Sequence, residues 1–257
     1  MDERILRELE LLPVSRLYGL ASAPARVAPQ EASAEPVVPQ ARATRPAPVP
    51  APRREPPAAS PPAAVPEPPA GIGAMDWAAL RQAVGDCRRC VLCEKRKQAV
   101  FGVGNESAPW LFVGEGPGAE EDERGEPFVG QAGKLLDGML AALRLARGRE
   151  VYIANVVKCR PPGNRVPAPE EAAACAAFLD RQVELIAPKI IVALGKTAAT
   201  RLTGSEASLA SLRGRVHAYR GIPLVVTYHP AYLLRNLPDK AKAWEDLLFA
   251  RRIFAQA

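Results

Sequence analysis

Four short apolar runs divide the second part of the chain, and each precedes a longer stretch with helical periodicity. The runs cover residues 110–113, 151–154, 190–194 and 224–227. Apolar runs of this length are typical of strands buried on both faces of a parallel sheet. The helical patterns that follow them cover residues 131–145, 169–186, 196–202 and 240–254. This alternation predicts one α/β domain over residues 75–257, a three-layer α/β/α sandwich around a four-stranded parallel sheet.

The residues before this domain have a different composition. Residues 21–74 contain fifteen prolines and no aromatic residue, so they have little apolar surface to bury and are predicted to form a disordered linker. Residues 1–20 predict a short N-terminal helix whose apolar face holds Ile5, Leu6, Leu9 and Leu12. Two interpretations of this helix stay open: a frayed terminal helix, and a peptide that docks on a protein partner.

The net charge of +6 belongs to the predicted domain, because basic and acidic residues balance over residues 1–74. A basic surface suits polyanions such as DNA, although a generally basic surface explains the charge equally well. The first ten residues carry charges throughout, and no apolar stretch is long enough for a signal peptide or a membrane span. We therefore expect a cytoplasmic protein that is monomeric and does not bind membranes.

The spacing of the cysteines indicates a cofactor. Cys87 and Cys90 form a C-x-x-C pair, and Cys159 and Cys175 follow at a distance. Thiols stay reduced inside cells, so four such cysteines are typical of a metal or iron–sulfur centre rather than of disulfides. Spacing alone leaves zinc and iron–sulfur open, since both accept four thiolates. Cys93 adds a further thiol beside the pair, which we interpret as a spare.

Polar or glycine-rich segments follow all four predicted strands. They cover residues 114–122, 155–165, 195–197 and 228–235. The carboxyl ends of parallel strands meet at one edge of a sheet, and ligands of such sheets bind there. The sequence therefore predicts a binding site built from these four segments.

Two familiar motifs in these segments are set aside. A G-x-G-x-x-A pattern from residue 114 matches a loose dinucleotide fingerprint, but Glu120, Glu121 and Asp122 follow where a pyrophosphate would lie. We interpret Glu120 and Glu121 as solvated loop carboxylates. Residues 195–197 match the end of a phosphate-binding loop, but Ile190 stands where that loop requires its first glycine. Neither segment is predicted to bind nucleotide phosphates.

Longer motifs carry a resemblance to a known family. They are residues 114–118 (GEGPG), 127–130 (PFVG), 155–162 (NVVKCRPP) and 229–235 (HPAYLLR). In this order and spacing they resemble the family 4 uracil-DNA glycosylases, the iron–sulfur members of the uracil-DNA glycosylase superfamily. The resemblance covers residues 76–257 and implies a [4Fe–4S] cluster held by Cys87, Cys90, Cys159 and Cys175. It also implies a monofunctional enzyme of base excision repair, which hydrolyses the N-glycosidic bond of deoxyuridine, releases uracil and leaves an abasic site in DNA.

The same resemblance assigns roles to residues at the strand ends. Phe128 would stack on uracil, and Asn155 would pair with its N3–H and O4 edge. His229 would donate a hydrogen bond to O2 as negative charge develops on the leaving base. Glu115, together with the backbone of Gly116, would position or activate the attacking water.

Contacts with DNA form a second predicted set. Leu233 and Leu234 would push into the base stack, although a helix start with two core leucines is an equally open interpretation. The cations predicted to contact DNA phosphates are Lys134, Arg160, Arg165 and Arg235.

Other functions use some of these features. An iron–sulfur redox protein, or a DNA-binding protein without glycosylase activity, would also explain the cysteines and the basic domain. Neither needs Phe128, Asn155 and His229 at one edge of the sheet, so a glycosylase is favoured. A relative that traps DNA covalently is disfavoured, because its basic insert has no counterpart between Cys159 and Arg165. The preference for single- or double-stranded DNA and activity on other deaminated bases stay open.

Overall fold

The structure is a computed structural model, and it describes residues 71–256. The predicted N-terminal helix and the predicted linker up to residue 70 lie outside the described residues. Packing begins near the first of these residues. Ile72, in the 3₁₀ helix η1 (Ile72–Ala74), is 3% exposed and belongs to the hydrophobic core. The packed chain thus starts slightly before the predicted boundary at residue 75.

A mixed six-stranded sheet forms the centre of the domain, in the order β1-β3-β2-β4-β6-β5. Its inner strands are parallel and contain the four predicted apolar runs: β2 (Trp110–Gly114), β3 (Val151–Asn155), β4 (Ile190–Leu194) and β6 (Ile222–Thr227). The prediction of a purely parallel four-stranded sheet is wrong at both edges. There, β1 (Val103–Gly104) and β5 (His217–Tyr219) add antiparallel strands. Both are short and at most half-buried, so they leave no apolar run in the sequence.

Side chains along the strands alternate between two cores, as the pleat of a sheet requires. Leu111 and Val113 of β2 belong to one core, and Trp110 and Phe112 to the other. All four side chains are at most 2% exposed. Both faces of the sheet are therefore covered, which explains why the inner strands are apolar without interruption.

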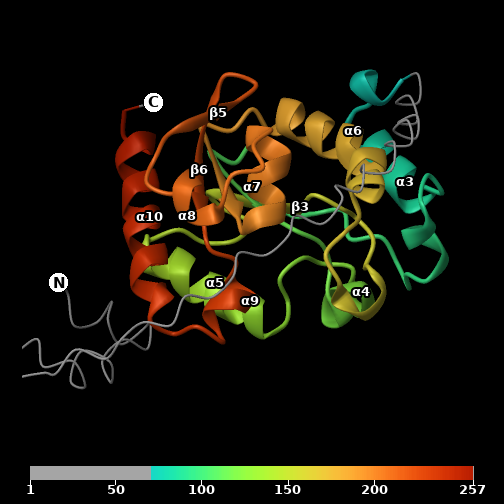
Figure 1. Ribbon diagram of the computed structural model, residues 1–257. Helices are drawn as coiled ribbons and strands as arrows, with labels where there is room; N and C mark the ends of the chain where they lie inside the picture. The colour runs from blue at the N-terminus through green and yellow to red at the C-terminus, as the bar shows by residue number, and fades with distance from the viewer. Residues whose placement is uncertain (1–70, 257) are drawn as a thin grey trace, which may run out of the picture.

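Two sets of helices cover the two faces (Figure 1). The core of Leu111 is completed mainly by α3 (Trp77–Gly85), α6 (Pro169–Ile186) and α7 (Lys196–Thr203). The core of Trp110 is completed by α5 (Gln131–Ala142) and α10 (Asp239–Phe254). The connections contain the short elements η2 (Val91–Glu94), α4 (Ala119–Arg124), η3 (Pro162–Asn164), α8 (Leu209–Leu212) and α9 (Pro230–Leu233). In the described part of the chain, no helix is both long and apolar enough to cross a membrane.

The predicted long helices are confirmed, with small shifts at some ends. Helix α6 has its predicted bounds, because Pro169 occupies the first turn and Ala187 ends the helix in the left-handed conformation. Helix α5 ends at residue 142 instead of 145. Arg144 takes a positive φ of 63°, and the amides of residues 143–145 turn back onto the last carbonyls of the helix.

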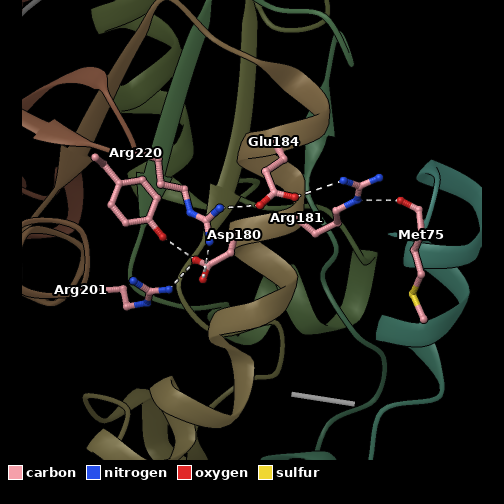
Figure 2. A network of polar contacts seen from close by, with 7 residues as sticks. Met75, Asp180, Arg181, Glu184, Arg201 and Arg220 are labelled. Atoms are coloured by element: carbon pink, nitrogen blue, oxygen red, sulfur yellow. Dashed lines mark hydrogen bonds and ion pairs between the residues drawn. The ribbon is translucent and has the colours of Figure 1, made fainter. Parts of the chain in front are cut away.

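A polar network joins α6 to α7, to the end of β5 with the turn after it, and to Met75 between η1 and α3 (Figure 2). Asp180 lies at its centre and accepts hydrogen bonds from Arg201 and, at 2.5 Å, from the hydroxyl of Tyr219. Glu184 pairs with Arg220 and Arg181, and Arg181 also donates to the carbonyl of Met75. The side chain of Asp180 is only 23% exposed, so its partners are partly shielded from water.

We expect Asp180→Ala to lower the free energy of unfolding by about 1–3 kcal/mol, because Arg201 and Tyr219 lose a shielded acceptor. Urea unfolding measures the change. The control is Glu106→Ala, which removes an ion pair with Arg81 whose side chains are 46% and 55% exposed; it should cost less than about 1 kcal/mol. Equal losses in the two variants would contradict the importance of the network.

Candidate active site

The carboxyl ends of the inner strands open onto a cleft of about 480 Å³, at the edge of the sheet where α4 and α9 lie (Figure 1). Glu115 and Gly116 reach it after β2, Asn155 from the end of β3 and His229 after β6. Phe128 lines it from the loop before α5. The structure thus brings together all five residues that the sequence predicted to act on uracil.

Phe128 forms one wall of the cleft in an unusual backbone conformation, with a φ of 57°. Its ring centre is 5.4 Å from that of His229, with the two planes tilted by 30°. Two glycines make room for it. A Cβ on Gly114 would come within 2.7 Å of the ring, and one on Gly133 within 1.8 Å of the Phe128 carbonyl oxygen. Gly114 therefore leaves room for the ring of Phe128, and Gly133 leaves room for its backbone.

The carboxylate of Glu121 fixes the loop that carries Phe128. It accepts hydrogen bonds from the backbone amides of Val129 at 2.9 Å and Gly130 at 3.1 Å. Its other oxygen accepts from the amide of Gly118 at 3.0 Å. The interpretation of Glu121 as a solvated carboxylate is therefore wrong, because it joins the loop after β2 to the loop before α5. Its position three residues after Gly118, at a helix start, is the local signal that indicates this role.

Arg147 holds the same loop through the backbone carbonyls of the loop. Its guanidinium donates to the carbonyl of Pro127 at 2.8 Å and of Phe128 at 2.6 Å, and it pairs with Asp137 at 2.6 Å. No motif in the sequence indicates this role of Arg147. Together with Glu121 it satisfies donors and acceptors on both sides of the strained Phe128 backbone.

Asn155 presents an acceptor that nothing in the described chain satisfies. The residue ends β3, pairs with Gly114 of β2 and is 2% exposed. Its Oδ1 atom is buried without a hydrogen-bond partner among the described residues. Buried acceptors are almost always satisfied in folded proteins, so an orphan in a cleft points to a ligand that donates there.

Lys158 supports Asn155 from behind. The side chain is 1% exposed, and its ammonium donates to the Asn155 carbonyl at 2.9 Å and to Gln182 of α6 at 2.6 Å. Burial lowers the pKa of Lys158 to about 8. No pattern in the sequence indicates this role of Lys158, because a lysine in a loop is normally exposed.

His229 is held as a neutral hydrogen-bond donor. Its Nδ1 atom accepts from the amide of Ala231 at 3.2 Å, so the proton of the neutral ring is on Nε2. Burial, helped by the nearby charge of Arg235, lowers the pKa of His229 to about 4. The imidazole is therefore uncharged at neutral pH and presents one N–H group.

Glu115 is positioned by Thr197 of α7, whose hydroxyl donates to its carboxylate. This threonine belongs to the Gly-Lys-Thr segment after β4. The segment thus contributes to the cleft through a side-chain hydroxyl, in a role different from that of a phosphate-binding loop.

Of the residues predicted to contact DNA after β6, one is buried and two are exposed. Leu233 is 1% exposed and packs in the core, so its prediction as a wedge is wrong; Leu234 is 41% exposed. Arg235 is exposed and lines the cleft.

The remaining predicted cations are engaged differently. Lys134 is exposed on the first turn of α5 and lies outside the cleft lining. Arg160 donates to the side chain of Asn164 at 2.7 Å. Arg165 lines the cleft, but its guanidinium is bonded in two places to Glu171. Its charge is therefore used in an ion pair within the protein.

The four predicted ligand cysteines come from three segments of the chain and contact one hydrophobic core. Cys159 and Cys175 are buried, and Cys87 and Cys90 are half-buried against the same hydrophobic cluster. Burial raises the pKa of Cys175 to about 12, and the charges of Cys159 and Cys87 act in the same direction. Within residues 71–256, no group of three or more Cys, His, Asp or Glu side chains has the arrangement of a metal site. Cys93, the predicted spare, is half-buried.

Comparison with known proteins shows the family to which the chain belongs. The model of the uracil DNA glycosylase superfamily matches residues 101–248, which include all five residues above. The chain belongs to this superfamily. Its relatives include the type-4 uracil-DNA glycosylase of Thermotoga maritima, 48% identical over 165 residues that cover 63% of this chain and 85% of the relative. The type-4 enzyme of Archaeoglobus fulgidus is 46% identical, with 58% and 78% covered.

Two relatives with lower sequence identity are also uracil-DNA glycosylases. The type-4 uracil-DNA glycosylase of Pyrobaculum aerophilum is 41% identical over 181 residues, which cover 67% of this chain and 92% of the relative. The type-5 uracil-DNA glycosylase of Thermus thermophilus is 32% identical over 197 residues. The resemblance to family 4 that the motifs indicated is confirmed.

We expect Glu121→Ala to release the Phe128 loop. Hydrogen exchange at the amides of Gly118, Val129 and Gly130 should become at least about tenfold faster, because each loses its acceptor. The control is Glu120→Ala, which removes a neighbouring carboxylate that is 55% exposed; it should leave these amides unchanged. Equal protection in both variants would show that Glu121 does not hold the loop.

Proposed function

We propose that this protein is a monofunctional uracil-DNA glycosylase of base excision repair. It hydrolyses the bond between C1′ of deoxyribose and N1 of uracil, and leaves an abasic site. The observation that carries the proposal is the buried Oδ1 of Asn155, which has no partner in the described chain and shares a cleft with Phe128 and His229. An acceptor at this place suits the N3–H of uracil.

The amide of Asn155 provides base selectivity. Its Oδ1 accepts from N3–H of uracil while its Nδ2 donates to O4. Cytosine has an acceptor at N3 and a donor at C4, so both contacts would oppose like groups in a buried site. Phe128 stacks on the base, and its fixed backbone sets the plane in which the base lies.

Cleavage develops positive charge on the sugar and negative charge on uracil. The Nε2–H of neutral His229 donates to O2 and stabilises the departing anion. Glu115, held by Thr197, orients the water that adds to C1′, and its negative charge stabilises the cationic sugar. The Ala231 amide holds the His229 ring, and Lys158 holds the backbone of Asn155, before the substrate arrives. The site therefore needs little reorganisation during the reaction.

The bond is out of reach in a base-paired helix, so the nucleotide must leave the stack at a cost of a few kcal/mol. Leu234 is exposed beside the cleft and suits an apolar wedge, while Arg235 lies next to it and suits a phosphate contact. Lys134 and Arg160 suit more distant phosphates.

The proposal includes a [4Fe–4S] cluster held by Cys87, Cys90, Cys159 and Cys175. The thiols of Cys90, Cys159 and Cys175 have raised pKa values because they are buried, and a cationic cluster is what would favour their thiolate forms. Arg96 donates to the sulfur of Cys159 at 2.9 Å, and the amide of Lys158 to that of Cys175 at 3.3 Å. Hydrogen bonds to the sulfurs are usual around such clusters. The cluster would cross-link the segment before β1 to the loop after β3 and to α6, which is a structural role.

The cluster is tested by composition. The purified protein should contain about four iron atoms and four sulfides per chain, with visible absorption. Cys90→Ser and Cys175→Ser should lose most of both, whereas the control Cys93→Ser should retain them. Zinc in place of iron would contradict the proposed cluster. Equal loss of iron in Cys93→Ser would contradict the proposed ligand set.

The activity is tested on end-labelled oligonucleotides that carry one uracil, followed by alkaline cleavage of the abasic site. We expect cleavage at uracil, and none at thymine or cytosine in matched oligonucleotides. Glu115→Ala, Asn155→Ala and His229→Ala should each slow single-turnover excision at least about tenfold, roughly 1.4 kcal/mol of barrier.

The control is His217→Ala, which removes the other histidine of the described domain, on β5, where it contacts the carbonyl of Leu212. It should excise uracil at the rate of the unchanged protein. Full activity in all three cleft variants would exclude the site assignment, and an inactive protein with its cluster in place would exclude the function.

A further inference from the structure

Large apolar side chains are rarely exposed in this domain, and the exceptions gather partly around the cleft. Among residues 71–256 the exposed ones are Val91, Val166, Val216, Leu234 and Leu237. Val166 is 63% exposed, and it also lines the cleft. No packing in the described domain accounts for an apolar side chain at this position.

The backbone around Val166 is unusually well braced. Arg165 donates to the Val166 carbonyl at 3.0 Å and binds both oxygens of Glu171, at 2.8 and 2.6 Å. Glu171 also accepts from the amide of Ala168 at 2.8 Å. Prolines at 167 and 169 restrict the chain further. The exposed valine is therefore held in place by a rigid turn.

The strand order places this turn across the cleft from Leu234. Val166 lies in the connection after β3, and Leu234 directly after α9, which follows β6. Strands β2 and β4 separate β3 from β6 in the sheet. The segments that carry these two exposed residues therefore lie at opposite sides of the cleft.

The charges around Val166 are compatible with DNA. Glu171 is 4% exposed, and Arg165 neutralises it. The side chain of Arg165 remains 44% exposed, so the ion pair leaves no uncompensated carboxylate of Glu171 facing the cleft. Apolar side chains inserted between base steps are a device by which proteins unstack DNA, and Val166 presents such a side chain on a rigid turn.

We propose that Val166 is a second wedge, which contacts the base stack beside the extruded uridine from the side opposite to Leu234. This inference rests on the proposed glycosylase function. Its partner is duplex DNA, since only a stacked and paired uracil has to be displaced.

The test compares the same uracil in duplex and in single-stranded oligonucleotides. Val166→Ala should lose about tenfold in single-turnover excision from the duplex and less than about twofold from the single strand. Val166→Leu should retain duplex activity, because it keeps an apolar tip. The control is Val216→Ala, which truncates a valine that is 49% exposed outside the cleft; it should behave as the unchanged protein on both substrates.

A second measurement reads unstacking directly. A fluorescent 2-aminopurine beside the uracil should brighten on binding to the unchanged protein and clearly less on binding to Val166→Ala. Equal losses on both substrates, or no loss on the duplex together with unchanged fluorescence, would overturn the wedge. If the unchanged protein excises no uracil at all, the proposed function fails, and the fluorescence still decides whether Val166 unstacks DNA.

Discussion

The parallel pairing of β2 with β3 is the constraint on which the candidate site depends. It sets Gly114 directly opposite Asn155 at the ends of the two strands. Because Gly114 has no side chain, the ring of Phe128 and the amide of Asn155 both lie in the space that a Cβ there would need. The same sheet carries β4 and β6, where Gly195 lies against His229. The side chains of Asn155 and His229 are thus set relative to one another by the pairing of the strands that precede them.

Behind these groups lies a set of polar side chains that act as braces. Glu121 and Arg147 hold the Phe128 loop, Lys158 holds the carbonyl of Asn155, and Thr197 holds Glu115. The braces use their hydrogen bonds within the protein, while Oδ1 of Asn155 is left without a partner in the described chain. Electrostatic preorganisation requires such an arrangement, since donors and acceptors must be fixed before charge develops.

Helix α6 connects the cysteines to the cleft. It carries Cys175, Glu171 and Gln182, which lie respectively among the cysteines, behind the turn of Val166 and behind Lys158. A helix is rigid over this length, so a cluster bound at Cys175 would fix the support of both Val166 and Asn155. In this arrangement the proposed cluster stabilises the cleft without touching the substrate.

The sequence by itself determined the inner strands, the long helices, the edge of the sheet that forms the site, the five residues expected to act on uracil and the family. All of these depend on local patterns: apolar runs, glycines, and motifs at fixed spacing. The tertiary structure alone decided which of Leu233 and Leu234 is exposed, that Glu121 is a brace, and that short β1 and β5 complete the sheet. Burial and hydrogen-bond partners depend on residues distant in the chain, as Thr197 and Glu115 illustrate at a separation of 82 residues. No local pattern encodes such contacts, so only the folded chain reveals them.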